Sequence, residues 1–198
     1  MSLEFERDVT EESPRTKNES LFVEVETLRK RQKESLFIPE IEGFSVAGFN
    51  IPAENVSGDG FGVISDSGKT KFYIFDVTSH GLSTSIDWGM AHAMFNFASR
   101  SGLSPKEAIY EVEYHLDKMT GHHIVPVTAI FGEIDKEGNM SYVHAGHTRP
   151  LFYSAQVGRV LPDNDVVIKE GMGNGRALNT GTEEPVDINN SEHNYYSH

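Results

Sequence analysis

The sequence contains no cysteine among its 198 residues, which excludes disulfide bonds, cysteine-ligated zinc, iron–sulfur clusters and a thiol nucleophile. It also contains no apolar stretch that approaches the roughly 20 residues needed by a membrane-spanning helix. The N-terminus lacks the apolar core of a secretory signal peptide. We therefore expect a cytoplasmic protein that is not inserted directly into a membrane.

Basic residues are scarce as well. The sequence has 17 lysines and arginines but 30 aspartates and glutamates, which gives a formal net charge of −13. A surface this acidic repels phosphate backbones and anionic lipids, so we expect no nucleic-acid partner. Hydrophobic residues make up 37% of the sequence and aromatic residues 10%, which is enough for a packed core. The length suits one domain of ordinary size with a tail.

The N-terminal part of the chain divides into a polar tail and a helix. Residues 1–20 are charged, lack hydrophobic periodicity and contain Pro14, so we predict a disordered tail over 1–20. A stripe at helical spacing then predicts an amphipathic linker helix over 21–36; its positions are Leu21, Val25, Leu28, Gln32 and Leu36. This helix either packs on its own domain or forms the seam of a homodimer, and the pattern leaves both open.

The rest of the chain reads as strands, then two helices, then strands. The expected strands and hairpins lie at 44–53, 61–77, 125–135, 140–146 and 149–155, and the helices at about 85–101 and 104–120. This order predicts an α+β fold in which two antiparallel sheets form a sandwich with helices outside. The helix positions expected to be buried are Met90, Met94, Phe97, Ile109, Val112 and Leu116.

Two aspartates form the strongest local feature. Asp59 precedes the first strand of the 61–77 hairpin and Asp76 ends the second, so a turn at 66–68 would bring both to the same open end. Two close carboxylates repel each other unless a cation lies between them, and Mg²⁺ or Mn²⁺ favours such oxygen ligands. The pattern leaves open that Asp59 is a turn residue and Asp76 a helix cap.

Histidines suggest zinc as another hypothesis. His144 and His147 lie close together, as do His122 and His123, but the sequence has no His-Glu-x-x-His pattern. We expect His80, His144 and His147 to be structural or peripheral rather than a zinc triad.

Four segments carry recognisable motifs in a fixed order. Residues 38–59 lead into Ser-Gly-Asp, and 75–85 read FDVTSHGLSTS. Residues 127–147 contain a Thr-Ala hairpin followed by His-Ala-Gly-His, and RPLFY follows at 149–153. Taken together, they resemble the stage II sporulation protein E-type (SpoIIE-like) branch of the PPM, or protein phosphatase 2C-like, serine/threonine phosphatases. The resemblance covers roughly residues 36–180.

This resemblance implies a protein phosphatase 2C-like fold and a metal-dependent phosphatase. The expected substrate is a phosphoserine or phosphothreonine on a regulatory protein of the anti-sigma-factor-antagonist type, as in bacterial stress signalling. The resemblance assigns Asp59 and Asp76 to two Mn²⁺ or Mg²⁺ ions, adds the backbone carbonyl of Val77 as a ligand, and has the ions activate a water. A non-catalytic regulatory module with the same fold is the alternative.

The resemblance also has a gap. Members of this family carry a later Asp-Gly motif and a last strand with Asp-Asp, and the sequence up to His198 contains neither in a matching context. We therefore expect residues 37–198 to be a phosphatase domain that is incomplete at its C-terminus. As a consequence, we expect the 198 residues alone to hydrolyse phosphoesters poorly.

Overall fold

The computed structural model describes residues 14–53, 55–66, 68–78, 81–120, 125–154 and 158–161. In chain order, the elements are α1 (Pro14–Ser35), β1 (Asp59–Asp66), β2 (Lys69–Val77), α2 (Thr84–Arg100), α3 (Pro105–Thr120), β3 (Val127–Asp135), β4 (Met140–Ala145), β5 (Phe152–Ser154) and β6 (Arg159–Leu161). Across these ranges, no helix is both long and apolar enough to cross a membrane.

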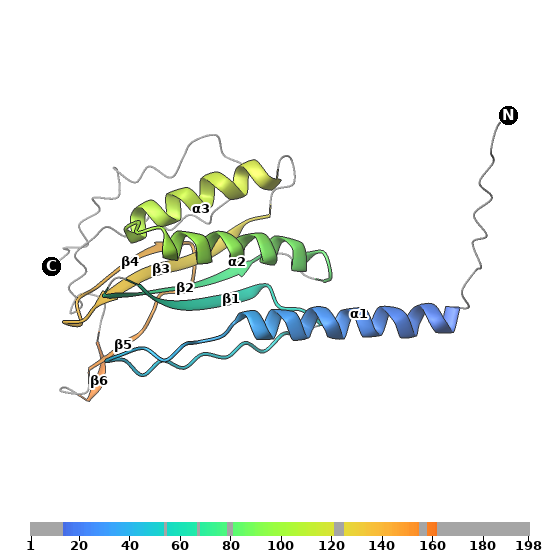
Figure 1. Cartoon of the computed structure of the whole chain (residues 1–198), viewed down its shortest axis with the longest axis horizontal. Helices are drawn as coiled ribbons and strands as arrows, with labels where there is room; N and C mark the ends of the chain where they lie inside the picture. Colours follow the sequence, from blue (N-terminus) through green and yellow to red (C-terminus); the bar gives the residue numbers. More distant parts are fainter. Residues whose placement is uncertain are drawn as a thin grey trace.

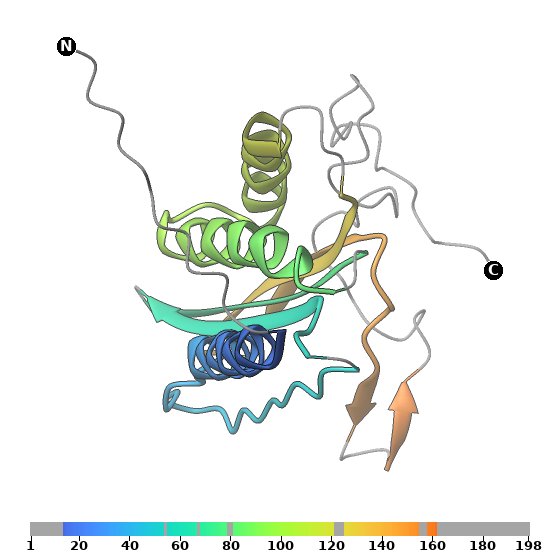
Figure 2. The ribbon, with the colours of Figure 1, turned by 90° about the vertical axis from the view of Figure 1, so that its right-hand side faces the viewer.

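The strands β1 to β4 form one antiparallel sheet in sequential order, and β5 pairs with β6 in a separate two-stranded ribbon. The helices α2 and α3 cover one face of the large sheet, whereas α1 lies on its other side (Figures 1 and 2). The expected α+β class and both predicted hairpins are confirmed. Gly68 and Gly138 turn these hairpins with φ of 83° and 85°, a region that glycine adopts without strain.

Aromatic rings fill the space between the sheet and the helices. Tyr73, Phe75 and Val77 alternate along β2 towards α2 and α3, and each is at most 2% exposed. Phe95 of α2 stacks on Tyr73 and on Phe75, with ring centroids 5.3 Å apart in both pairs. Because side chains alternate along a strand, Asp76 leaves β2 on the face opposite to these helices.

The buried face of α2 differs from the one predicted from the sequence. Phe97 is 62% exposed, while Met90 and Met94 are only partly buried against the core. The apolar side chains that α2 buries are Trp88, Ala91, Phe95 and Ala98. The rings of Trp88 and Phe95 need the deep position next to the sheet, and this sets the rotation of the helix. The predicted buried positions of α3 are confirmed at Ile109, Val112 and Leu116.

A capping box fixes the start of α3. The Ser104 N–H and hydroxyl both donate to the Glu107 carboxylate, at 2.9 and 2.8 Å, and the Glu107 N–H lies 3.4 Å from the Ser104 hydroxyl. These hydrogen bonds lower the pKa of Glu107. Pro105 then takes the first helical position, where a missing N–H costs nothing.

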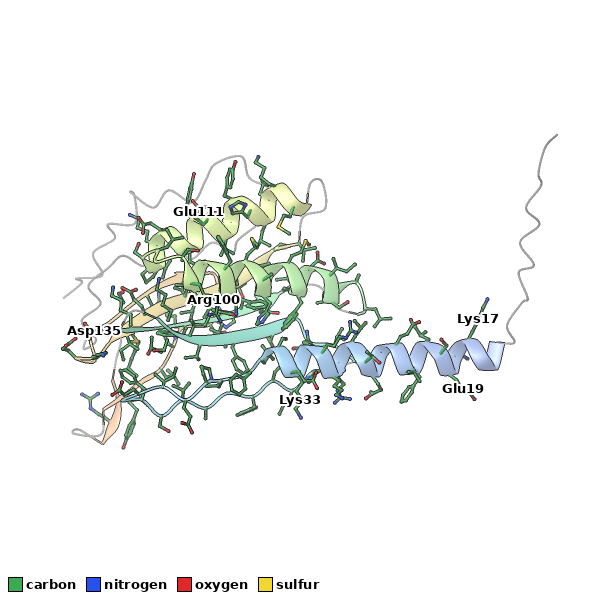
Figure 3. All side chains as sticks on the ribbon, in the orientation of Figure 1. Lys17, Glu19, Lys33, Arg100, Glu111 and Asp135 are labelled. Atoms are coloured by element: carbon green, nitrogen blue, oxygen red, sulfur yellow. The ribbon has the colours of Figure 1, made fainter. Side chains whose placement is uncertain are left out.

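The N-terminal helix is longer than predicted. It begins at Pro14, so residues 14–20 belong to α1 and not to the expected tail. Proline favours the first position of a helix, which explains why Pro14 starts α1. Lys17 and Glu19 lie on the part of α1 that extends beyond the sheet, whereas Lys33 lies near it (Figure 3). A homodimer through residues 21–36 stays a prediction.

The strand expected over residues 44–53 is absent from the structure. The segment takes part in β pairing only at an isolated bridge between Ile41 and Phe44. A strand needs a neighbour for its N–H and C=O groups, and 44–53 instead lies against α1 and β1. A Cβ atom on Gly48 would lie 2.9 Å from the Phe61 ring, which shows how closely this segment packs on β1.

Candidate metal centre

The two aspartates face each other across the open end of the β1–β2 hairpin. Asp59 and Asp76 are direct partners in the antiparallel register. The Val77 N–H donates to the Gly58 carbonyl at 3.1 Å, so Asp59 and Asp76 form the adjacent non-hydrogen-bonded pair. In such pairs the Cα atoms are only about 4.5 Å apart and the side chains come closest. The predicted shared position of the aspartates is confirmed, and their role as metal ligands stays a prediction.

The electrostatics of this pair suit a cation. The pKa of Asp59 is raised mainly by partial burial of its carboxyl group and further by the negative charge of Asp76. The interaction with His147 lowers it. No lysine or arginine is among the groups that shift the pKa of Asp59. Two carboxylates that repel each other offer the oxygen ligands that Mg²⁺ and Mn²⁺ prefer.

The backbone of Asp59 is held from outside the hairpin. A residue in a non-hydrogen-bonded pair points its N–H and C=O away from the partner strand. The Asp59 carbonyl accepts hydrogen bonds from Trp88 Nε1 at 2.7 Å and from Asn50 Nδ2 at 2.9 Å. Its N–H donates to the Ser57 hydroxyl at 3.0 Å. These contacts fix the position of Asp59 independently of any ion.

Gly60 is required for the approach of α2 to Asp59. A Cβ atom at this position would lie 2.3 Å from the Phe75 ring and 2.9 Å from Trp88 Nε1. The missing side chain therefore lets the indole of Trp88 reach the Asp59 carbonyl.

Gln32 connects α1 to the same loop. Its side chain is 7% exposed, although most of α1 faces solvent. Gln32 Nε2 donates to the Ser57 carbonyl at 2.8 Å, and the Ser57 N–H donates to Gln32 Oε1 at 2.9 Å. Through Gln32, α1 thus forms hydrogen bonds with both backbone groups of Ser57, the buried residue whose hydroxyl accepts the hydrogen bond from the Asp59 N–H.

Replacing Gln32 by alanine should lower the free energy of unfolding by about 1–3 kcal/mol, because both buried backbone groups of Ser57 would lose their partner. Urea denaturation of the two proteins measures this difference. Arg31→Ala changes the neighbouring, exposed position of α1 and serves as the control, with an expected change below about 0.5 kcal/mol. A Gln32→Ala value as small as that of the control would contradict the role assigned to these hydrogen bonds.

His147, which is predicted from the sequence to be structural or peripheral, lies beside the aspartates. Thr128 of β3 is the direct partner of Asp76, and Thr128 Oγ1 lies 2.8 Å from His147 Nδ1. Burial lowers the pKa of His147, and the negative charges of Asp76 and Asp59 oppose that shift. Asp59, Asp76 and Thr128 therefore form one row across three strands, and His147 extends the row.

The other sequence-predicted site residues fall in different places. His144 Nε2 contacts the backbone carbonyl of His147, so it supports the loop after β4. Val77 buries its side chain under the helices, so only its backbone is available to an ion, as the resemblance implies. His80, His122 and His123 lie outside the described residues. Among the residues that are described, no group of three or more His, Cys, Asp or Glu side chains could hold a metal ion.

His92 packs directly against the indole that holds Asp59. Its ring stacks on Trp88 with centroids 4.8 Å apart and planes 12° apart. Burial lowers the pKa of His92 below its usual 6.5, while a hydrogen bond with the backbone of Ser35 opposes this shift.

The pKa of His92 makes stability depend on pH. The unfolded chain takes up the His92 proton near pH 6.5, whereas the folded chain takes it up only at lower pH. Stability should therefore fall as the pH drops below about 6.5. Melting temperatures of the metal-free chain at pH 7.5 and 5.5 measure the effect. In His92→Phe, which keeps a ring on Trp88, the pH-dependent loss should be smaller, and an equal loss would assign it to other groups.

The chain is similar to known proteins both in sequence and in structure. The sequence profile of the family described as "Stage II sporulation protein E (SpoIIE)" matches residues 66–176, more than half of the chain. The matched range contains Asp76, Val77, Thr128 and His147, whereas Asp59 lies before it. The "Phosphoserine phosphatase RsbP" of Bacillus subtilis (strain 168) is 31% identical over an alignment of 138 residues that covers 65% of this chain and 34% of that protein.

Two solved structures are also similar to this chain. The RsbU and RsbW domains of Rv1364c from Mycobacterium tuberculosis match 67% of this chain and 35% of that one, with a TM-score of 0.53 and 19% identity. The SiaA-PP2C domain of Pseudomonas aeruginosa matches 48% of this chain and 40% of that one, with a TM-score of 0.44 and 16% identity. The likeness to the Rv1364c domains supports the fold alone. The chain spans about a third of the length of RsbP.

Proposed function

This chain belongs to the stage II sporulation protein E (SpoIIE) family, and on that premise we propose that it is the site-bearing part of a metal-dependent protein serine/threonine phosphatase. Its substrate would be a phosphoserine or phosphothreonine on a regulatory protein. The name of its relative RsbP, a phosphoserine phosphatase, supports this class of substrate. A regulatory protein of the anti-sigma-factor-antagonist type is our more specific proposal.

The paired aspartates carry this proposal. Asp59 and Asp76 are direct cross-strand partners, and the charge of Asp76 raises the pKa of Asp59. Carboxylates in this arrangement fit hard divalent cations, so we assign Mn²⁺ or Mg²⁺ to them. Val77 would add its backbone carbonyl, and the remaining ligands would be waters or oxygens from outside the described residues.

The reaction adds water across a phosphoester bond. The water oxygen bonds to phosphorus, the bond from phosphorus to the seryl oxygen breaks, and that oxygen takes a proton. When bound, the cations would lower the pKa of the water and offset the charge of the phosphoryl group. The chain itself keeps Asp59 in place through Trp88, Asn50 and Ser57. Because these hydrogen bonds to the Asp59 backbone are formed before a substrate arrives, little reorganisation is needed during the reaction.

Release of phosphate from a phosphoserine peptide tests the proposal. We expect release that depends on Mn²⁺ and stops when a chelator is added. Because the chain spans about a third of RsbP, the assay is run on the 198 residues and on a version extended through an Asp-Gly motif, with the slower rate expected for the former. Release that persists in the chelator, or no release by either protein at any Mn²⁺ concentration, would contradict the proposed function; the latter result would favour a non-catalytic module.

A further inference from the structure

His147 is fixed at three points although it lies at the rim of the sheet. Its ring Nδ1 pairs with the Thr128 hydroxyl, and its carbonyl is contacted by His144 Nε2. The preceding residue, Gly146, forms a bridge with Ala129 of β3. The ring is only half-buried, so these contacts do more to orient it than to fill the core.

The position of Thr128 places the His147 ring next to the two aspartates. Direct partners in a sheet direct their side chains to the same face, so Thr128 and Asp76 lie side by side on the face away from α2 and α3. Asp59 continues the same row on the next strand. The ring of His147 is therefore anchored at the end of the row formed by the two aspartates.

The hydrogen bond with Thr128 can also select a tautomer. When the Thr128 hydroxyl donates to Nδ1, the proton of the neutral ring is on Nε2. Nε2 is then a hydrogen-bond donor that carries no charge. A lysine or arginine at this place would pair with the aspartates and compete with a cation, whereas a neutral N–H donor leaves the carboxylates available.

We propose that His147 is a substrate-binding residue of this site, whose Nε2–H donates a hydrogen bond to a non-bridging oxygen of the phosphoryl group, and that Thr128 is its positioning residue. The inference rests on the proposed function, since it assumes that the aspartates hold cations and that a phosphoryl group binds there. No proton is transferred in this contact. The hydrogen bond orients the phosphoryl group, and inorganic phosphate, which carries the same oxygens, should use it as well.

Calorimetric titration in two steps tests the inference on the full chain. The first step measures Mn²⁺ affinity, and the second measures the affinity of the Mn²⁺-loaded chain for inorganic phosphate. His147→Leu should weaken phosphate binding by about 10–100-fold, since a hydrogen bond to a charged group is lost. Thr128→Val should also weaken phosphate binding. The Mn²⁺ affinity should stay within about twofold of the unaltered chain in both variants, because neither substitution removes a proposed metal ligand.

Conservative variants separate positioning from general disturbance. Thr128→Ser keeps the hydroxyl group and should recover most of the phosphate affinity that is lost in Thr128→Val. His147→Gln keeps an N–H donor and should recover most of the phosphate affinity that is lost in His147→Leu. His115→Leu removes a histidine from α3, which pairs with Glu111 on the far side of the sheet, and should leave phosphate affinity unchanged.

Several results would overturn the inference. Phosphate affinity that is unchanged in His147→Leu, or equal in Thr128→Val and Thr128→Ser, would show a merely structural role. A parallel loss of Mn²⁺ affinity in His147→Leu would make the residue a metal ligand instead. Normal Mn²⁺ binding without phosphate binding by the unaltered chain would overturn this inference alone. Absence of Mn²⁺ binding would overturn the proposed function and this inference with it.

Discussion

Asp76→Asn should reduce Mn²⁺-dependent phosphate release from a phosphoserine peptide by more than about 100-fold, because loss of a residue that merely supports a metal ligand already costs about 10–100-fold. Asparagine has the shape of aspartate but lacks its charge, so the cations would lose half of the carboxylate charge provided by the pair. The rates of phosphate release by the extended chain with and without the substitution measure this effect.

The same substitution should not unfold the protein. The negative charge of Asp76 repels that of Asp59 and adds to the rise in the Asp59 pKa that burial causes. Removing the Asp76 charge therefore removes an unfavourable interaction from the metal-free folded state. The melting temperature of Asp76→Asn without metal should therefore equal or exceed that of the unaltered chain. Asp117→Asn removes a charge from the exposed surface of α3 and serves as the control. A rate for Asp76→Asn equal to that of Asp117→Asn would contradict the metal assignment.

Phe95→Ala should lower the free energy of unfolding by about 3–5 kcal/mol, which is a large share of the stability of a typical domain. Phe95 is 0% exposed and stacks on Tyr73 and Phe75 between α2 and the sheet. Its removal would leave a cavity directly behind β2, the strand that carries Asp76 near its C-terminal end. Urea denaturation followed by circular dichroism measures the loss.

Phe97→Ala provides a matched control on the same helix. Its ring is 62% exposed, so the free energy of unfolding should change by less than about 0.5 kcal/mol. Equal losses in Phe95→Ala and Phe97→Ala would show that α2 does not present to the sheet the face described above.

The position of the aspartates was predictable because it depends on local chemistry. The tight turn at Gly68 fixes the register of the β1–β2 hairpin, and this register determines that Asp59 meets Asp76. The capping residues before α3 likewise determine where that helix begins. Such features lie within a few residues of each other, so the sequence contains the information needed to place them.

The rotation of α2 depended on packing between distant residues. Trp88 and Phe95 fit against β1 and β2, and Gly60 provides the space that the indole needs. Periodicity alone assigned Met90, Met94 and Phe97 to the same helix face, because it counts apolar residues without regard to their shape. A signal was present in the glycines of β1, whose missing side chains indicate a close neighbour.

The position of His147 beside the aspartates was not predicted from the sequence, because it also depends on contacts between distant residues. Its contact with Thr128 joins residues 19 positions apart, and its approach to Asp76 requires the pairing of β2 with β3. A sequence reading could have found it by aligning Thr128 with Asp76 across the sheet. The segment 44–53 illustrates the opposite case, in which residues with a strand-like sequence pair with no strand and pack against α1 and the side chains of β1.

Titration of Mn²⁺ into the metal-free chain, followed by calorimetry, tests most directly whether the paired aspartates form a cation site. We expect saturable binding for which Mg²⁺ competes and which disappears in the double variant Asp59→Asn, Asp76→Asn. Binding of equal affinity in the double variant, or no saturable binding by the unaltered chain, would contradict this expectation.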